Sequence, residues 1–326
     1  MKKMRAAVVG VGYLGRFHAQ KYASLKDVEL VGVADSDPVR AAEIAGELGT
    51  TAYGDYRELA GKVDLVSIVV PTRFHHEVAS FFLQNGVHIL LEKPITTTVA
   101  EARELIAMAA ASGLVLQVGH LERFNPAFTE VAGILKRPGF IESMRVAPFK
   151  PRGTDVSVVL DLMVHDIDII RRFVGSEITS ISATGAVVYS SEPDIANARI
   201  EFACGCVANV TASRVSLKSE RRMQIFQEDA YISVDFQNRT ATIATRGEGE
   251  SAPGVPAVNV RELSVPQRDQ ILAEIEAFVD SVAHGTPVVV PGEDGLNALE
   301  TALLVEEKIR ESIARFKAAG CCGQGE

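Results

Sequence analysis

Short apolar runs alternate with amphipathic stretches along the first 120 residues of the chain. The apolar runs predict β-strands at 5–9, 28–34, 64–70, 87–91 and 114–119. The stretches between them carry apolar residues at helical spacing, as at Val78, Phe81 and Phe82. Strands that alternate with helices through short connections are typical of a parallel sheet with crossover helices. We therefore predict an α/β domain with a parallel sheet over residues 1–120.

A different pattern begins after residue 120. Asn125 followed by Pro126 is a typical helix start, and we expect that helix to run to Lys136. A strand at 141–148 and a helix at 156–173 follow. Alternating apolar and polar positions then predict strands at 178–189, 197–204, 206–214, 221–227, 230–236, 240–245 and 258–263. Such a series of alternating strands indicates an open antiparallel sheet in an α+β domain.

Two late helices, at 269–284 and 293–317, complete this second domain, which we predict to span residues 121–317. The Gly- and Pro-rich segment 246–256 has the composition of a surface loop. Residues 318–326 are predicted to be a flexible tail.

Length and charge limit the classes of protein to which this chain can belong. Its 326 residues exceed what one hydrophobic core usually supports, which favours two domains. The 33 Lys and Arg residues against 42 Asp and Glu give a net charge of −9, which argues against nucleic acids and anionic membranes as partners. No window has the apolar length of a membrane helix, and the opening residues are typical of a strand rather than a secretory signal. We expect a cytoplasmic enzyme that acts on a small molecule.

The cysteines form two close pairs, Cys204 with Cys206 and Cys321 with Cys322. Neither pair has the two-residue spacer typical of metal-binding or redox-active thiols. We therefore expect neither of these roles, and four cysteines provide no disulfide framework.

A glycine motif follows the first predicted strand and precedes a candidate helix at 16–25. Gly10 permits a tight turn, Gly12 leaves no Cβ in the way of a pyrophosphate, and Gly15 lets the helix lie close to its strand. The unpaired N–H groups at the helix N-terminus then face the phosphates. A glycine turn without a ligand is the alternative, but the strand before and the helix after favour a Rossmann dinucleotide site.

An acidic residue follows the second predicted strand. Asp35 lies 20 residues after Gly15, where a carboxylate meets the adenosine ribose. It accepts hydrogen bonds from a 2′-hydroxyl and repels a 2′-phosphate, so it predicts NAD rather than NADP, although Arg40 nearby softens that preference. Ligands of such sheets bind at the carboxyl ends of the strands. Further cofactor contacts are accordingly predicted at Tyr13, Leu14, Pro71, Thr72, His75, Glu92 and Lys93.

Glu92, Lys93 and Pro94 stand where a central strand must stop, because proline cannot continue the ladder. A lysine at the carboxyl end of a strand, near a bound nicotinamide, can donate to a substrate hydroxyl and stabilise alkoxide character. The alternative for Lys93 is a surface lysine paired with Glu92.

Polar groups interrupt the strongly apolar helix predicted at 156–173. Asp161, His165 and Asp168 are spaced i, i+4 and i+7, which places them on one helical face. Asp161 can then orient the His165 imidazole, which takes the proton of an alcohol. The alternatives are a solvated helix face or a buried histidine whose hydrogen bonds are satisfied by aspartate. A metal site is a third alternative, but the sequence shows no additional ligands nearby.

These motifs together resemble the glucose-fructose oxidoreductase and inositol dehydrogenase family over nearly the whole chain. The resemblance implies a Rossmann domain followed by a domain whose open antiparallel sheet often mediates oligomers. It also implies Lys93, Asp161 and His165 as the catalytic set. The family's turn after the third main strand usually reads Thr-Pro-Asn, with a histidine following. Pro71 and His75 match that turn, whereas Val70 and Thr72 depart from it.

The segment 119–126 is similar to that of one nucleotide-sugar subfamily, which oxidises the 3-hydroxyl of UDP-N-acetylglucosamine to a ketone. Arg123 and Asn125 follow the last Rossmann strand and are candidate substrate-binding residues. Arg123 can fork onto a phosphate or onto sugar oxygens. Asn125 has an alternative role as a helix cap only.

The sequence therefore predicts an NAD-dependent dehydrogenase for a sugar hydroxyl, with the 3-hydroxyl of UDP-N-acetylglucosamine as the preferred substrate. A free-sugar or inositol dehydrogenase is one alternative, and a non-catalytic NAD-binding regulator is another. The resemblance implies a homodimer or homotetramer.

Overall fold

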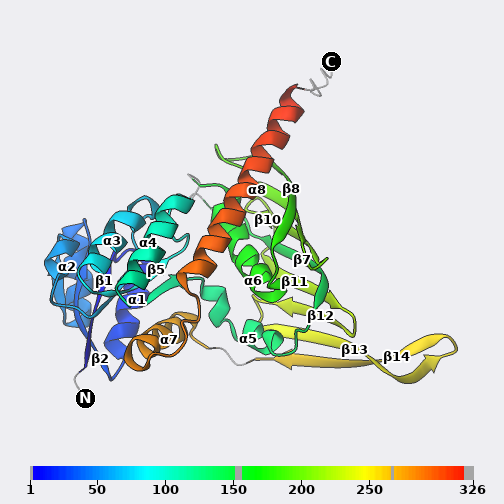
Figure 1. Ribbon diagram of the computed structural model, residues 1–326, viewed down its shortest axis with the longest axis horizontal. Coiled ribbons are helices and arrows are strands. Elements are labelled where there is room, and N and C mark those ends of the chain that lie inside the picture. The colour runs from blue at the N-terminus through cyan, green and yellow to red at the C-terminus, as the bar shows by residue number, and fades with distance from the viewer. Residues whose placement is uncertain (1–2, 151–155, 266–267, 319–326) are drawn as a thin grey trace. The chain divides into compact units, whose positions relative to one another are not determined.

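The computed structural model describes residues 3–150, 156–265 and 268–318, and the chain divides into two compact units (Figure 1). The first unit contains Met1–Phe124 and Asp269–Leu299. The second contains Asn125–Arg268 and Glu300–Glu326. Of the predicted tail at 318–326, residues 319–326, including Cys321 and Cys322, lie outside the described residues.

The first unit is built on a six-stranded parallel sheet with the order β3-β2-β1-β4-β5-β6. The strands are β1 (Met4–Val9), β2 (Val28–Ala34), β3 (Thr51–Tyr53), β4 (Leu65–Ile68), β5 (His88–Glu92) and β6 (Leu116–Gly119). The predicted parallel sheet is confirmed. Only β3 was not predicted, because it has three residues and two of them are exposed, so it has no apolar run.

Helices cover this sheet, and local signals explain where they begin. They are α1 (Tyr13–Ser24), α2 (Pro38–Leu48), α3 (His75–Gln84) and α4 (Val99–Ala111), with short 3-10 turns η1 (Tyr56–Leu59), η2 (Thr72–Phe74) and η3 (Leu121–Phe124). Asp37 caps α2 ahead of Pro38, and Thr98 forms a capping box with Glu101 at the start of α4. Helix α1 begins three residues before the predicted start, directly after Gly12.

One late helix, α7 (Gln270–His284), belongs to the first unit rather than to the second. Its Ile275 and Phe278 are fully buried in the same hydrophobic cluster as Ala19 and Tyr22 of α1. The prediction of one continuous second domain over residues 121–317 missed this return of the chain to the first unit. The apolar face of an amphipathic helix does not show in sequence which sheet it covers.

The second unit contains an eight-stranded sheet with the order β14-β13-β12-β11-β7-β10-β9-β8. Its strands are β7 (Pro138–Val146), β8 (Ile178–Ala186), β9 (Ile195–Phe202), β10 (Val207–Ser213), β11 (Glu220–Gln227), β12 (Ala230–Asp235), β13 (Thr240–Ala252) and β14 (Val255–Ser264). All neighbours are antiparallel except β7 and β10, which pair in parallel. The predicted open antiparallel sheet is thus confirmed, with this one exception.

The predicted surface loop at 246–256 is wrong. Strands β13 and β14 continue through it as a hairpin, and Figure 1 shows this ribbon (yellow) extending beyond the other strands of its sheet. The pairing becomes irregular after Arg246, and the chain turns at Gly254, whose φ is +78°. Glycine and proline composition indicated a loop, but cross-strand hydrogen bonds do not depend on side chains.

The helices of the second unit differ from the prediction in two places. Helix α5 (Pro126–Ala132) ends before Lys136, and a π-helical turn η4 (Val159–Met163) precedes α6 (Val164–Val174). The last helix, α8 (Gly292–Ala318), belongs to the first unit as far as Leu299 and to the second from Glu300. Among the described helices, none combines the length and the apolar character needed to cross a membrane.

Candidate active site

The three glycines of the motif each meet a different constraint. Gly10 has a φ of +83°, and a Cβ there would lie 2.6 Å from the Val69 carbonyl oxygen. A Cβ on Gly15 would lie 1.8 Å from the carbonyl oxygen of Gly10, so the helix can approach its strand only with glycine there. A Cβ on Gly12, the N-cap of α1, would meet nothing within 4 Å. The space beside Gly12 and the open helix N-terminus form a cradle for a pyrophosphate.

Asp35 ends β2 and is held by backbone donors. Its Oδ2 accepts from the Val11 N–H at 2.8 Å, and its Oδ1 accepts from the Asp37 N–H at 2.9 Å. Each oxygen keeps a second lone pair, so the carboxylate can still accept from ribose hydroxyls. Arg40 is exposed, and its Nη2 lies 3.6 Å from Asp37 Oδ2, which directs part of its charge away from Asp35.

A cavity of about 780 Å³ opens at the carboxyl ends of β1, β2 and β4, within the first unit. Gly10, Gly12, Asp35 and Arg40 line one part of it. The remaining walls include Asp55, Tyr56, Arg57, Val70, Pro71, Arg73, Phe74 and Glu77. A volume of this size, with both apolar and charged side chains in its walls, suits the adenosine half of a dinucleotide.

The segment after β5 carries Lys93, which is half-buried and is joined to Pro94 by a cis peptide bond. His75 supports this segment from inside, because its ring nitrogens lie 2.9 Å from the Pro94 and Val70 carbonyl oxygens. Burial lowers the pKa of His75, although the two carbonyls favour its charged form. His75 is 1% exposed, so it supports the cofactor cavity from behind rather than from its surface. Thr72 opens η2 and is bonded through its carbonyl oxygen to the His75 N–H.

In the second unit, Asp161 lies within the π-helical turn η4 and His165 is the second residue of α6. Both are half-buried, whereas Asp166 and Asp168 are each 2% exposed. The prediction of one uniform α-helix is wrong here, because η4 widens the turn that carries Asp161. The turn that leads from Asp161 to His165 is therefore wider than the α-helical turn expected from their spacing.

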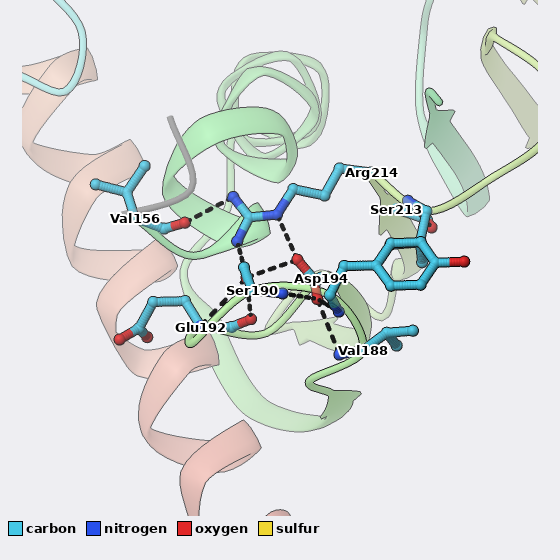
Figure 2. A network of polar contacts seen from close by, with 9 residues as sticks. Val156, Val188, Ser190, Glu192, Asp194, Ser213 and Arg214 are labelled. Carbon is cyan, nitrogen blue, oxygen red and sulfur yellow. Dashed lines mark hydrogen bonds and ion pairs between the residues drawn. The ribbon is translucent and has the colours of Figure 1, made fainter. Parts of the chain in front are cut away.

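A buried ion pair fixes the chain just before η4 (Figure 2). Arg214 donates from Nη1 to the Val156 carbonyl at 2.8 Å and from Nε to Asp194 Oδ1 at 2.7 Å. Burial alone would raise the pKa of Asp194, but backbone donors at Ser190 and Tyr189 together with Arg214 lower it well below its usual range. Sequence reasoning missed Asp194 and Arg214, because nothing in the alternating strand pattern marks them.

Arg123 and Asn125, the predicted substrate contacts, each have a partner within the fold. Arg123 is buried, and its Nη2 lies 2.9 Å from Asp294 Oδ2. Asn125 caps α5 by accepting from the Ala127 N–H, and it donates from Nδ2 to the Phe236 carbonyl. The helix cap expected as the alternative role of Asn125 is present.

Cys204 and Cys206 lie in the turn between β9 and β10, and both are free thiols. Burial, followed by the neighbouring Cys204, raises the pKa of Cys206 to about 11. A thiol with such a pKa remains protonated at neutral pH and is a poor nucleophile and ligand.

Comparisons with known proteins identify the family. A model described as "Oxidoreductase family, NAD-binding Rossmann fold" matches residues 4–120, and a GFO/IDH/MocA C-terminal domain model matches residues 144–233. The chain is 43% identical to a UDP-N-acetylglucosamine 3-dehydrogenase of Acidithiobacillus ferrooxidans, over 97% of this chain and 100% of that protein. A solved structure of that A. ferrooxidans enzyme superposes with a TM-score of 0.89 at 40% identity, covering 96% of this chain and 99% of the other.

A second relative acts on a cyclitol. The scyllo-inositol 2-dehydrogenase (NAD(+)) of Bacillus subtilis is 27% identical over 95% of each chain. The predicted resemblance is thereby confirmed: the chain belongs to the GFO/IDH/MocA family of oxidoreductases, whose N-terminal domain is an NAD-binding Rossmann fold.

Proposed function

We propose that this protein is an NAD-dependent dehydrogenase that oxidises the 3-hydroxyl of UDP-N-acetylglucosamine to a ketone. The observation that carries the proposal is the 43% identity to an enzyme of that name over nearly the full length of both chains. Identity to the inositol dehydrogenase of B. subtilis is 27% over a similar length. The difference favours a nucleotide sugar over a cyclitol.

The glycine cradle and Asp35 hold the cofactor in this proposal. Backbone N–H groups at the start of α1 bind the pyrophosphate beside Gly12, and Asp35 accepts from the adenosine ribose. Arg40, Pro71 and Thr72 are further contacts. When bound, NAD accepts the hydride that leaves the substrate carbon.

Lys93, His165 and Asp161 act on the substrate hydroxyl. Lys93 donates a hydrogen bond to the hydroxyl oxygen and stabilises the negative charge that develops on it. His165 takes the hydroxyl proton as general base, and Asp161 orients the imidazole. The carbon loses a hydride to the cofactor and the oxygen loses a proton to His165, so the products are a ketone, NADH and a protonated base.

An inositol or free-sugar dehydrogenase is the second candidate, because three more distant relatives are inositol dehydrogenases. Such an enzyme would need no uridine diphosphate on its substrate. The two candidates therefore differ in whether turnover depends on the nucleotide.

We further propose a homodimer or homotetramer that acts in the cytoplasm. Phe140, Phe226 and Tyr231 form a contiguous aromatic group on β7, β11 and β12, with ring centroids 5.7 and 5.1 Å apart. Phe226 is 40% exposed and Met144 nearby on β7 is 37% exposed. An apolar group on the face of a sheet supports association between copies of the chain. Light scattering on the purified protein tests the subunit number.

The substrate is tested by NADH absorbance with purified protein, NAD, and a panel of UDP-sugars, free sugars and inositols. A coupled acceptor draws the equilibrium towards product. The proposal predicts turnover with UDP-N-acetylglucosamine and none with the free sugar. Turnover of inositols or free sugars alone would establish the second candidate, and NAD binding without any turnover would indicate a non-catalytic regulator.

A further inference from the structure

Three ionisable side chains from three elements converge inside the first unit. They are His18 on α1, Glu92 at the end of β5 and Glu274 on α7, and their ligand-type atoms lie within 4.8 Å of one another. His18 is 1% exposed and Glu274 is 0% exposed. None of the three lines the cofactor cavity, although Glu92 was predicted as a cofactor contact and directly precedes Lys93 in the chain.

Glu274 stands out because both of its carboxylate oxygens are buried and receive no hydrogen bond from the described residues. The nearby amide of Gln117 donates to the backbone carbonyl of Glu274, at 3.1 Å, and not to its side chain. An ionised carboxylate taken out of water without a donor is very costly. A carboxylic acid in the same place needs only one acceptor for its proton.

Glu92 is the acceptor within the cluster, and no direct hydrogen bond joins it to Glu274 among the described residues. Two carboxyl groups that share a small buried site cannot both ionise. Burial first, and then the negative charge of Glu92, raise the pKa of Glu274 well above its ordinary value of 4.5. A separation of less than 4.8 Å is short enough for one bridging water to connect the two groups.

Other ionisable groups also lie on the elements that pack against α7, among them Arg16, Lys21 and Tyr22 on α1, His88 on β5, and Glu122 and Arg123 on η3. Tyr22 on α1 is buried, and burial raises its pKa, so its hydroxyl stays protonated. On η3, Arg123 is paired with Asp294 and lies beside Glu122 in sequence. Glu92 is the group whose charge acts on Glu274.

His18 approaches Glu92 from the opposite side of the site. Its Nε2 lies 3.4 Å from Glu92 Oε1, and its Nδ1 lies 3.2 Å from Ser67 Oγ. Ser67 Oγ is in turn 2.9 Å from the Tyr22 hydroxyl. Donors can therefore run from Tyr22 through Ser67 to His18 Nδ1, while His18 Nε2 faces the Glu92 carboxylate without a hydrogen bond among the described residues.

We propose that Glu274 is a neutral carboxylic acid whose proton is directed at Glu92, and that Glu274 and His18 are positioning residues that hold the Glu92 carboxylate next to Lys93. Glu92 Oε2 also accepts from the Lys93 backbone N–H at 3.3 Å, which links the cluster to the lysine. The positioning role rests on the proposed function of Lys93, whereas the protonation state of Glu274 does not.

A divalent cation is the rival occupant, because two carboxylates and an imidazole are common metal ligands. A closed structural zinc site takes four ligands. Among the described residues, this cluster offers three, from His18, Glu92 and Glu274. Three ligands fall short of a closed structural site, which favours the acid.

The protonation state is tested by infrared spectroscopy of the full-length protein at neutral pH. The wild type is expected to show the C=O stretch of a protonated carboxyl group, and Glu274→Gln is expected to lose it. Glu276→Gln, which alters an exposed glutamate on the same helix, is the matched control and should retain the band. This measurement needs no substrate, so it decides the point even if the proposed substrate is wrong.

Two results would overturn the neutral acid. One is an infrared spectrum that Glu274→Gln leaves unchanged. The other is one equivalent of a divalent metal in the purified wild type, measured by elemental mass spectrometry and lost in Glu274→Gln.

Stability against pH gives an independent readout with a defined sign. A carboxyl group whose pKa is raised by folding stabilises the fold below its ordinary pKa of 4.5 and loses that contribution as pH rises through its folded pKa. Relative to Glu274→Gln, the wild type should therefore become progressively less stable in denaturant unfolding above pH 4.5. A stability difference that does not change with pH would contradict the proposal.

The positioning role is tested by comparing Glu274→Gln with Glu274→Leu. Glutamine keeps an N–H donor towards Glu92, whereas leucine fills the space without one. We expect turnover of Glu274→Leu to be about tenfold below that of Glu274→Gln at unchanged NAD affinity, since small displacements of a reacting group reduce rate steeply. Equal turnover of the two variants would remove Glu274 from the positioning of Lys93.

Discussion

Two segments that follow strands of the parallel sheet differ in what their predicted site residues do in the structure. The motif Gly10–Gly15, after β1, was predicted from glycines whose role is to lack a side chain, and the structure shows the positive φ of Gly10 and the close backbone approach at Gly15. The segment 119–126, which begins at the end of β6, was predicted from polar side chains at Arg123 and Asn125. There the fold itself uses both side chains.

The difference has a physical cause. A glycine with positive φ or with a backbone atom 1.8–2.6 Å from its missing Cβ has one interpretation, because no other residue is tolerated. A buried polar side chain must find a partner, and an acceptor within the fold satisfies it as well as a ligand does. Residue type alone therefore predicts backbone roles better than side-chain roles.

The largest effect is expected at His165, a polar side chain that we propose acts on the substrate. His165→Ala should lower turnover by about two to four orders of magnitude, the usual contribution of a general base. NAD affinity, measured by titration calorimetry, should stay nearly unchanged. An unchanged turnover number would remove His165 from the mechanism. His165 would then be, like Arg123, a polar side chain that serves the fold.

Gly12→Ala tests the cradle without disturbing the fold. The added Cβ meets nothing within 4 Å of the protein, so folding should be intact. It occupies the space of the pyrophosphate, and losing one hydrogen bond to a charged group costs about 1.5–3 kcal/mol, or roughly 10- to 100-fold in NAD dissociation constant. Gly46→Ala, in helix α2, also places its Cβ in open space and should leave NAD binding unchanged. Similar binding by the two variants would refute a phosphate site at Gly12.

Arg123→Met distinguishes a structural role of Arg123, as the partner of Asp294, from a role in substrate binding. Removing a buried partner of an ion pair destabilises strongly, but Asp294 is 25% exposed and can be rehydrated, so we expect a loss of about 2 kcal/mol in the free energy of unfolding. The KM for UDP-N-acetylglucosamine should stay within about twofold in the folded variant. A large rise in KM with unchanged stability would restore Arg123 as a substrate residue.

Asn125→Ala has the smallest expected effect. Loss of the cap on α5 should cost about 1 kcal/mol, measured by thermal unfolding. Asn125→Asp keeps the capping oxygen and should recover most of that loss. If the aspartate variant were as unstable as the alanine variant, the bond from Asn125 Nδ2 to Phe236 would carry the effect instead.

Much of the fold was predictable because most strands are marked by their apolar runs. The boundaries of β2, Val28–Ala34, match the prediction, and the parallel order follows from the alternation with helices. The short edge strand β3 and the hairpin of β13 and β14 were missed, because their residues are largely exposed and their pairing is made by the backbone. Periodicity also gave no sign of the π-helical turn at Val159–Met163.

Of the candidate site, sequence reasoning reached the residues that belong to short local motifs. Gly10, Gly12 and Asp35 lie together around one cavity as predicted. The buried Asp194 and Glu274 were missed, because their surroundings come from elements far apart in the sequence. Burial of a single acidic residue inside an amphipathic helix or a strand connection leaves no pattern to detect.

The most direct test of the proposed function follows the hydrogen at C3 of the sugar. UDP-N-acetylglucosamine deuterated at C3 is incubated with the protein and NAD, and the reduced cofactor is analysed by mass spectrometry. We predict one deuterium on each NADH and a ketone at C3 of the sugar product. NADH formed from this substrate without deuterium would contradict oxidation at C3, and the absence of any NADH would contradict the proposed substrate.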